Sequence, residues 1–81
     1  MIVTIELYGR LRDAGLGNCV EVELPEKATA AEALAGLRRK LGERGAWLDG
    51  TALASDSEVL APEATLPHAA RLAALPPVCG G

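Results

Sequence analysis

The last seven residues, 75–81, read Leu-Pro-Pro-Val-Cys-Gly-Gly and carry the most unusual chemical group of the chain. Gly80 and Gly81 have no side chains, so the terminal carboxylate can enter a slot too narrow for a residue with a Cβ. A carboxylate is inert towards nucleophiles until its oxygen becomes a good leaving group. Joining it to AMP provides that leaving group, and a sulfur nucleophile can then displace AMP and leave a thiocarboxylate. We therefore expect the C-terminus of Gly81 to be the reactive group.

The residues before the two glycines are suited to presenting them. Pro76 and Pro77 have no amide hydrogen to donate, so they end a strand and favour an extended path. Five residues counted from Pro77 reach at most about 17 Å. We expect residues 76–81 to form a flexible tail, in which Pro76, Pro77, Val78 and Gly80 bind a channel of a partner protein and bring Gly81 to its active site.

Few other residues have reactive side chains. Cys79 is a candidate transfer thiol, although no helix end or cationic neighbour is evident to activate it, which favours a tolerated small residue. Cys19 reads as a strand residue, and His68 as a surface loop residue with no visible acid partner. One histidine and two separated cysteines cannot form a structural zinc site, so we expect no metal on this chain. The tail chemistry requires no catalytic residue here, and a domain of this size leaves little volume for a bound cofactor, so we expect neither.

Two further groups of residues have alternative readings. Three charged residues follow the first strand-like run: Arg10, Arg12 and Asp13. They either contact a partner or belong to a solvated turn, and the sequence favours the solvated turn. An apolar docking patch could consist of Leu72, Leu75 and Val78. The alternative is that Leu72 and Leu75 belong to the core.

Composition limits the classes of function. A chain of 81 residues forms one small domain, 1–81, with an aliphatic core because Phe is absent. A net charge of −3 and a pI near 5.0 argue against a nucleic-acid partner. No apolar run approaches the roughly 20 residues of a membrane span, and no signal peptide precedes the first strand-like run. We expect a cytoplasmic protein with free thiols and no membrane partner.

Alternating apolar residues predict a β-hairpin at the start of the chain. Residues 1–8 read MIVTIELY, in which the apolar residues Val3, Ile5 and Leu7 share one face. The same alternation recurs in Cys19–Leu24, and Pro25 ends it. The segment between them, 10–18, predicts a charged turn or a single helical turn.

One helix is expected after the hairpin. Thr29 and Glu32 have the spacing of a capping box, which satisfies free amides at a helix start. Gly42 is a plausible helix C-cap. The apolar residues at helical spacing between them are Ala30, Leu34, Leu37 and Leu41.

The second half of the chain predicts short strands. Residues 42–50 read as a loop in which Trp47 and Leu48 cover one end of the core, and 51–55 and 58–60 read as short strands around a turn at Asp56. Arg71–Leu75 predicts a last strand, parallel to the first if the helix is a crossover connection. A helix between the hairpin and the later strands must cover one sheet face, so the fold class is a two-layer α+β domain.

The C-terminal motif is specific enough to indicate a family. LPPVCGG resembles the PPVxGG ending of MoaD-like small subunits of molybdopterin synthase, within the MoaD/ThiS ubiquitin-like sulfur-carrier family. Residues 1–16 resemble that family's first strand and turn, and residues 29–41 resemble its single helix. The resemblance implies a β-grasp, ubiquitin-like fold with a mixed sheet of four to five strands packed on one main helix.

The resemblance also implies a function. An E1-like (MoeB-like) adenylyltransferase would use ATP to adenylate Gly81, and a sulfur donor protein would supply the sulfur of the thiocarboxylate. The chain would then act as the non-catalytic small subunit of molybdopterin synthase, in a heterotetramer with a MoaE-like large subunit. That subunit would build the dithiolene of molybdopterin from cyclic pyranopterin monophosphate, and with it the molybdenum cofactor.

Some positions depart from the family pattern. Family members often have aromatic residues before the two prolines, an Asp-Gly turn before the last strand and an Asn in the turn after the third strand. This chain has Ala74 and Leu75, His68-Ala69-Ala70, and Asp56 at these places. Three alternatives stay open: a ThiS-like or other pathway sulfur carrier, a ubiquitin-like modifier joined to lysines through Gly81, and a β-grasp binding module with an inactive tail.

Overall fold

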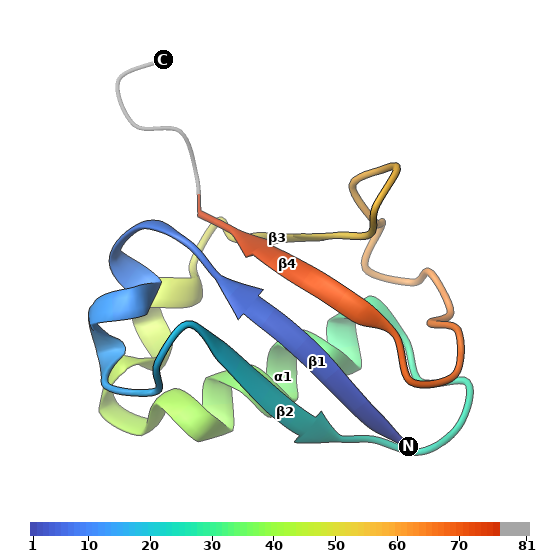
Figure 1. Cartoon of the computed structure of the whole chain (residues 1–81), viewed down its shortest axis with the longest axis horizontal. Helices are drawn as coiled ribbons and strands as arrows, with labels where there is room; N and C mark the ends of the chain where they lie inside the picture. Colours follow the sequence, from blue (N-terminus) through green and yellow to red (C-terminus); the bar gives the residue numbers. More distant parts are fainter. Residues whose placement is uncertain (77–81) are drawn as a thin grey trace.

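The computed structural model describes residues 1–76 and has two layers, a four-stranded sheet and one α-helix that covers one of its faces (Figure 1). The strands are β1 (Ile2–Leu7), β2 (Cys19–Glu23), β3 (Ala52–Ala54) and β4 (Arg71–Leu75), and the helix is α1 (Ala30–Leu41). The spatial order is β2-β1-β4-β3, so the first and last strands are central. This is the expected α+β class with a mixed sheet.

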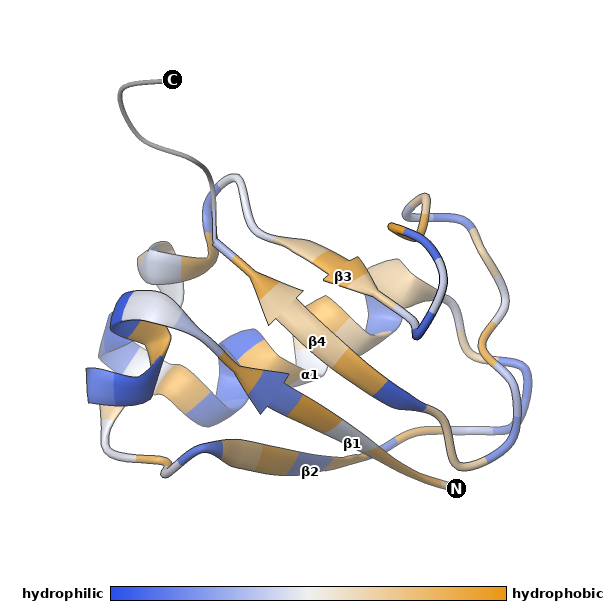
Figure 2. Ribbon diagram, turned by 45° about the horizontal axis from the view of Figure 1, so that its top comes forward, coloured by the Kyte–Doolittle hydropathy of each residue, from blue (hydrophilic) through white to orange (hydrophobic). Residues whose placement is uncertain are grey.

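Strand alternation produces the core. Val3, Ile5 and Leu7 of β1 are fully buried against α1, while the residues between them face the other side of the sheet. Figure 2 shows this alternation of hydrophobic and hydrophilic residues along β1. β1 pairs with β2 in the predicted antiparallel hairpin and with β4 in the predicted parallel arrangement.

The helix begins and ends where the sequence predicts. The Thr29 hydroxyl accepts a hydrogen bond from the Glu32 amide, the Glu32 carboxylate accepts one from the Thr29 amide, and Gly42 caps the C-terminus. The buried face is rotated from the predicted one, because Leu34 is only half-buried. The helix residues that are buried are Ala30, Ala33, Gly36, Leu37 and Leu41.

Gly36 explains that rotation. A Cβ at this position would lie 2.5 Å from Cγ1 of Val22 on β2, so the helix approaches the sheet through a residue that has no side chain.

Two connections are helical. The segment 10–18, predicted as a turn or single helical turn, overlaps a 3₁₀-helix, η1 (Gly9–Ala14). The loop predicted over 42–50 is wrong, because Gly42–Leu48 forms a second 3₁₀-helix, η2. Gly45 allows η2 to fold back on α1, since a Cβ there would lie 2.9 Å from Cγ of Arg38. Leu48 is buried and Trp47 partly buried against the core, as predicted.

The segment between β3 and β4 is mostly irregular. The strand predicted over 51–55 shortens to Ala52–Ala54, and the strand predicted over 58–60 is wrong, because only the isolated bridge of Ala54 to Val59 forms there. Proline residues at 62 and 67 interrupt the backbone pairing that a longer strand needs. Among residues 1–76, no helix is long and apolar enough to span a bilayer.

Candidate functional site

The structure places the base of the predicted tail at the end of a central strand. β4 pairs with β1 along Arg71–Ala74 and with β3 through Leu75, whose partner is Ala52. Pro76 follows at once and lacks the amide hydrogen that would extend the pairing. A strand held on both sides fixes the point and the direction from which the following residues leave the sheet.

Gly9 supports this point. Its φ of +60° lies in the left-handed region, and a Cβ on it would come within 3.0 Å of Cγ of Pro76. A side chain here would therefore be both strained and in contact with the proline ring. The sequence alone does not indicate this role of Gly9, because a glycine after a strand signals a turn but not which distant residue it touches.

A chain of polar contacts crosses the outer face of the sheet near the same point. The Tyr8 hydroxyl donates a hydrogen bond to the Glu6 carboxylate at 2.8 Å, and Arg71 donates to the same carboxylate at 3.2 Å. The Tyr8 hydrogen bond first, and then Arg71, lower the pKa of Glu6 from its ordinary value. The same hydrogen bond raises the pKa of Tyr8. Arg12 lies over the Tyr8 ring, 5.2 Å from its centroid.

Two further arginines gather on η1 and η2. Arg10 and Arg44 lie over the Trp47 ring, 5.3 and 5.7 Å from its centroid. The positively charged guanidinium groups are attracted to the electron-rich ring. Arg10 and Arg12 therefore have aromatic partners within the chain and are not simply solvated, as the sequence favoured. The sequence does not bring Arg10 and Trp47 together, because only tertiary folding places η1 beside η2.

The part of the chain that we predict to be reactive, 77–81, lies outside the described residues. Pro76 is described, and the predicted roles of Pro77, Val78, Cys79, Gly80 and Gly81 remain predictions.

The other candidates have clear positions. Cys19 is a residue of β2, as predicted, and it is exposed. His68 is exposed, but the prediction that it has no acid partner is wrong, because its Nδ1 lies 2.9 Å from a Glu26 carboxylate oxygen. Leu72 is buried core, whereas Leu75 is 37% exposed beside the tail base. In the described part of the chain, no group of three histidine, cysteine or acidic residues could hold a metal ion.

Comparison with known families gives the decisive result. The model of the ThiS family matches residues 5–81, which includes the two terminal glycines. The chain belongs to the ThiS family. A search of curated proteins found no match for it.

Solved structures agree on the fold of this ThiS-family chain. SAMP1 from Haloferax volcanii superposes with a TM-score of 0.77 at 24% identity, over all of both chains. A putative molybdopterin converting factor subunit 1 from Pyrococcus furiosus gives a TM-score of 0.81 at 17% identity, over 96% of this chain and 99% of that one. These neighbours confirm the predicted β-grasp, ubiquitin-like fold.

A third structure contains a complex. A chain in the complex of subunits 1 and 2 of the Helicobacter pylori molybdopterin-converting factor has a TM-score of 0.65 and 21% identity, over all of both chains. Family and fold together show a ThiS-family chain with the β-grasp fold of these solved structures.

Proposed function

We propose that this chain is a sulfur carrier whose C-terminal Gly81 is converted to a thiocarboxylate, and that it donates this sulfur to molybdopterin synthesis as the small subunit of molybdopterin synthase. The observation that carries the proposal is the family match over residues 5–81, which includes Gly80 and Gly81, beyond a central strand that ends at Leu75. The chain acts as a co-substrate, and the catalytic residues belong to its partners.

The chemistry takes two steps with a sulfide donor and three with a persulfide donor. An oxygen of the Gly81 carboxylate attacks the α-phosphorus of ATP, which forms an acyl-adenylate and releases pyrophosphate. A persulfide or sulfide sulfur supplied by a donor protein then attacks the carbonyl carbon, and AMP leaves with the C–O bond electrons. Where a persulfide is the donor, a thiol reductant of the partner system cleaves the S–S bond and releases the thiocarboxylate.

The tail residues have separate parts in this scheme. Pro76, packed against Gly9, directs the chain away from β4, and Pro77 and Val78 extend the tail into a channel of the partner. Gly80 lets the final peptide pass where a Cβ would collide. ATP is bound and used by the E1-like activating enzyme, and this chain holds no cofactor of its own.

The Helicobacter pylori complex of subunits 1 and 2 supports a second partner besides the activating enzyme, namely a large subunit. We propose that a large subunit receives the thiocarboxylate tail, in a cytoplasmic heterotetramer of two small and two large subunits. The exposed side chains of Leu75 and Tyr8, which precede Pro76 and Gly9 at the tail base, supply contact area for such a subunit.

Two other functions have specific support. The ThiS family model equally fits a carrier for another sulfur-containing product, such as thiamine. The likeness to SAMP1, a small archaeal modifier protein, favours a ubiquitin-like modifier joined to lysines through Gly81.

Intact-mass measurement separates these functions. The chain is incubated with an E1-like adenylyltransferase, ATP and a sulfur donor, and we expect the mass change of one oxygen replaced by one sulfur. No change under conditions that convert a known carrier contradicts the proposal. Formation of molybdopterin with the large subunit distinguishes it from other sulfur carriers, and isopeptide adducts on lysines would establish the modifier.

A further inference from the structure

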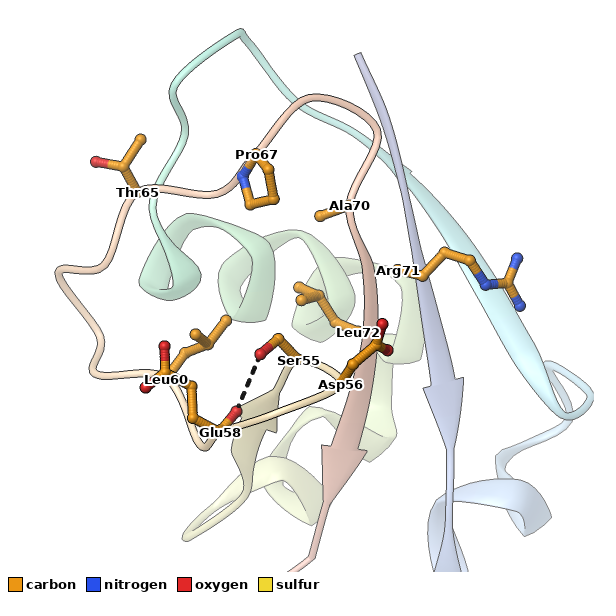
Figure 3. A pocket seen from close by; sticks show the side chains of 9 residues that line it. All are labelled: Ser55, Asp56, Glu58, Leu60, Thr65, Pro67, Ala70, Arg71 and Leu72. Carbon is orange, nitrogen blue, oxygen red and sulfur yellow. Dashed lines mark hydrogen bonds between the residues drawn. The ribbon is translucent and has the colours of Figure 1, made fainter.

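A pocket of about 510 Å³ lies at the other end of β4 from the tail (Figure 3). This volume is within the roughly 300–1,000 Å³ range of ligand pockets. It lies between the irregular segment that follows β3 and the start of β4. The residues that line it are Ser55, Asp56, Glu58, Leu60, Thr65, Pro67, Ala70, Arg71 and Leu72.

The inner wall of the pocket is apolar. Leu72 and Ala70 are buried members of the core, and Leu60 packs against that core while half-exposed. Pro67 closes the wall from the opposite loop, as Figure 3 shows. An occupant must therefore carry an aliphatic or aromatic portion to replace the water that these side chains exclude.

The rim of the pocket is negatively charged. Asp56 and Glu58 are exposed, and among residues 1–76 neither carboxylate forms a salt bridge. The turn that carries them is fixed, because the Ser55 amide donates to the Glu58 carbonyl at 2.8 Å. Arg71 is the one cationic residue of the lining, and its side chain points away from the pocket towards β1, where it pairs with Glu6 (Figure 3).

An apolar wall below two unpaired carboxylates matches a long cationic side chain. Lysine and arginine carry an aliphatic stem that packs on apolar surface and a charged head that reaches the rim. We propose that this pocket receives a lysine or arginine side chain of the adenylyltransferase that takes up the tail for activation. The identity of that partner rests on the proposed function, whereas the chemistry of the pocket does not.

The pocket and the tail base lie on one continuous surface. A smaller hollow adjoins the pocket and is lined by Ala54 and Ala73, which are paired neighbours on β3 and β4. Two positions further along the same strands, the pair of Ala52 and Leu75 lies at the tail base. From Arg71 to Leu75 a strand spans only about 13 Å. One partner surface can therefore hold the cationic side chain and the tail at once.

The chemistry of the pocket is tested with a small probe. Butylguanidinium and the uncharged, similarly shaped butylurea are titrated into the ¹⁵N-labelled full chain, and amide shifts are followed over residues 55–72. We expect saturable shifts with butylguanidinium and at least about threefold weaker binding of butylurea, because an exposed ion pair contributes modestly. Equal binding of the two probes, or no saturable shift, overturns the proposal.

Matched variants locate the binding. Asp56→Asn combined with Glu58→Gln should weaken butylguanidinium by at least about threefold. Glu23→Gln combined with Glu63→Gln removes the same charge outside the pocket and should change nothing. An equal loss in both double variants would reveal a general charge effect and would also overturn the proposal.

The occupant is tested in the activation assay. The Asp56→Asn/Glu58→Gln chain should show a raised KM with the adenylyltransferase and an unchanged kcat, while the control double variant behaves as wild type. An unchanged KM overturns the assignment to that partner. Self-association of the wild type that is lost in the Asp56→Asn/Glu58→Gln chain would assign the pocket to a second copy. If no chain is converted, the proposed function fails while the probe titration still decides the pocket.

Discussion

The two ends of β4 use the same unusual backbone geometry for different reasons. Where β4 ends, Gly9 has a φ of 60° and leaves no room for a Cβ beside Pro76. Where β4 begins, Ala69 has a φ of 55° although it carries a side chain, which is exposed. The C-terminal end of β4 thus depends on the close packing of Gly9 against Pro76. The segment before β4 instead tolerates backbone strain at Ala69, whose side chain is exposed.

The surroundings of the two ends also differ in charge. Arginines 10, 12 and 44 lie over aromatic rings on the side where the tail leaves. The beginning of β4 adjoins the carboxylates of Asp56 and Glu58 and the Glu26–His68 pair. The arginines over aromatic rings and the two carboxylates of the pocket rim thus lie at opposite ends of β4, and this difference favours one orientation of a partner that spans the strand.

The largest expected effect is on the tail end alone. Deleting Gly81, or adding one residue after it, should lower thiocarboxylate formation at least about 100-fold, because the acyl carbon is misplaced in the activating enzyme. The thermal midpoint should not change, since the buried core residues of the described chain are left in place. Mass spectrometry and thermal unfolding measure the two quantities. Retained conversion by the extended chain would contradict the role of Gly81.

Gly9→Ala tests whether close packing supports the tail end. We expect a loss of about 1–3 kcal/mol in the free energy of unfolding, from left-handed strain and the contact with Pro76. Gly17→Ala is the matched control, since Gly17 has a φ of +85° but nothing within 4 Å of an added Cβ. Urea unfolding should show a smaller loss in the control. Equal losses would mean that the Pro76 contact adds nothing.

Ala69→Gly sharpens the other half of the comparison. Relief of left-handed strain outweighs the entropy that glycine adds to the unfolded chain, so we expect stabilisation by about 0.5 kcal/mol. Ala61→Gly, at an exposed position of negative φ in the same segment, should be destabilising instead. Denaturant midpoints of both variants give the sign. A destabilised Ala69→Gly chain would show that the turn is not strained.

The smallest effect concerns pH. The His68 hydrogen bond is the main cause that lowers the pKa of Glu26 from 4.5, and Tyr8 and then Arg71 lower that of Glu6. A lowered folded-state pKa adds stability above the unfolded value, and this stability is lost as the pH falls below about 4.5 through the folded value. Glu6→Gln and Glu26→Gln should each reduce that acid loss in urea titrations between pH 7 and 3. Glu63→Gln, which has no ion pair in the described part of the chain, should leave the pH dependence as in wild type.

The correct sequence predictions depend on local rules. The strands around Val3 and Val22 follow from alternation, because successive side chains of a strand face opposite sides. The helix start at Thr29 follows from the capping box, whose two hydrogen bonds span only three residues. The end of β4 at Leu75 follows from the missing amide hydrogen of Pro76.

The errors have a different origin. Residues 42–48 form a 3₁₀-helix because Gly45 lets the segment pack on Arg38. A polar, glycine-rich sequence does not predict this contact. His68 acquires Glu26 as a partner across 42 positions of sequence. Neither contact leaves a periodic signal, so neither could be found from the residues alone.

The sequence by itself determined the order of the main strands and the helix, the family, and the glycine pair expected to react, because hydrophobic period, capping and the Pro-Pro-Val-x-Gly-Gly pattern are all written in neighbouring residues. Only the tertiary structure decided that Gly9 supports Pro76, that arginines stack on Trp47, and that a pocket with two carboxylates opens at the far end of β4. Those features join segments that are distant along the chain, and chain folding alone brings them within contact distance.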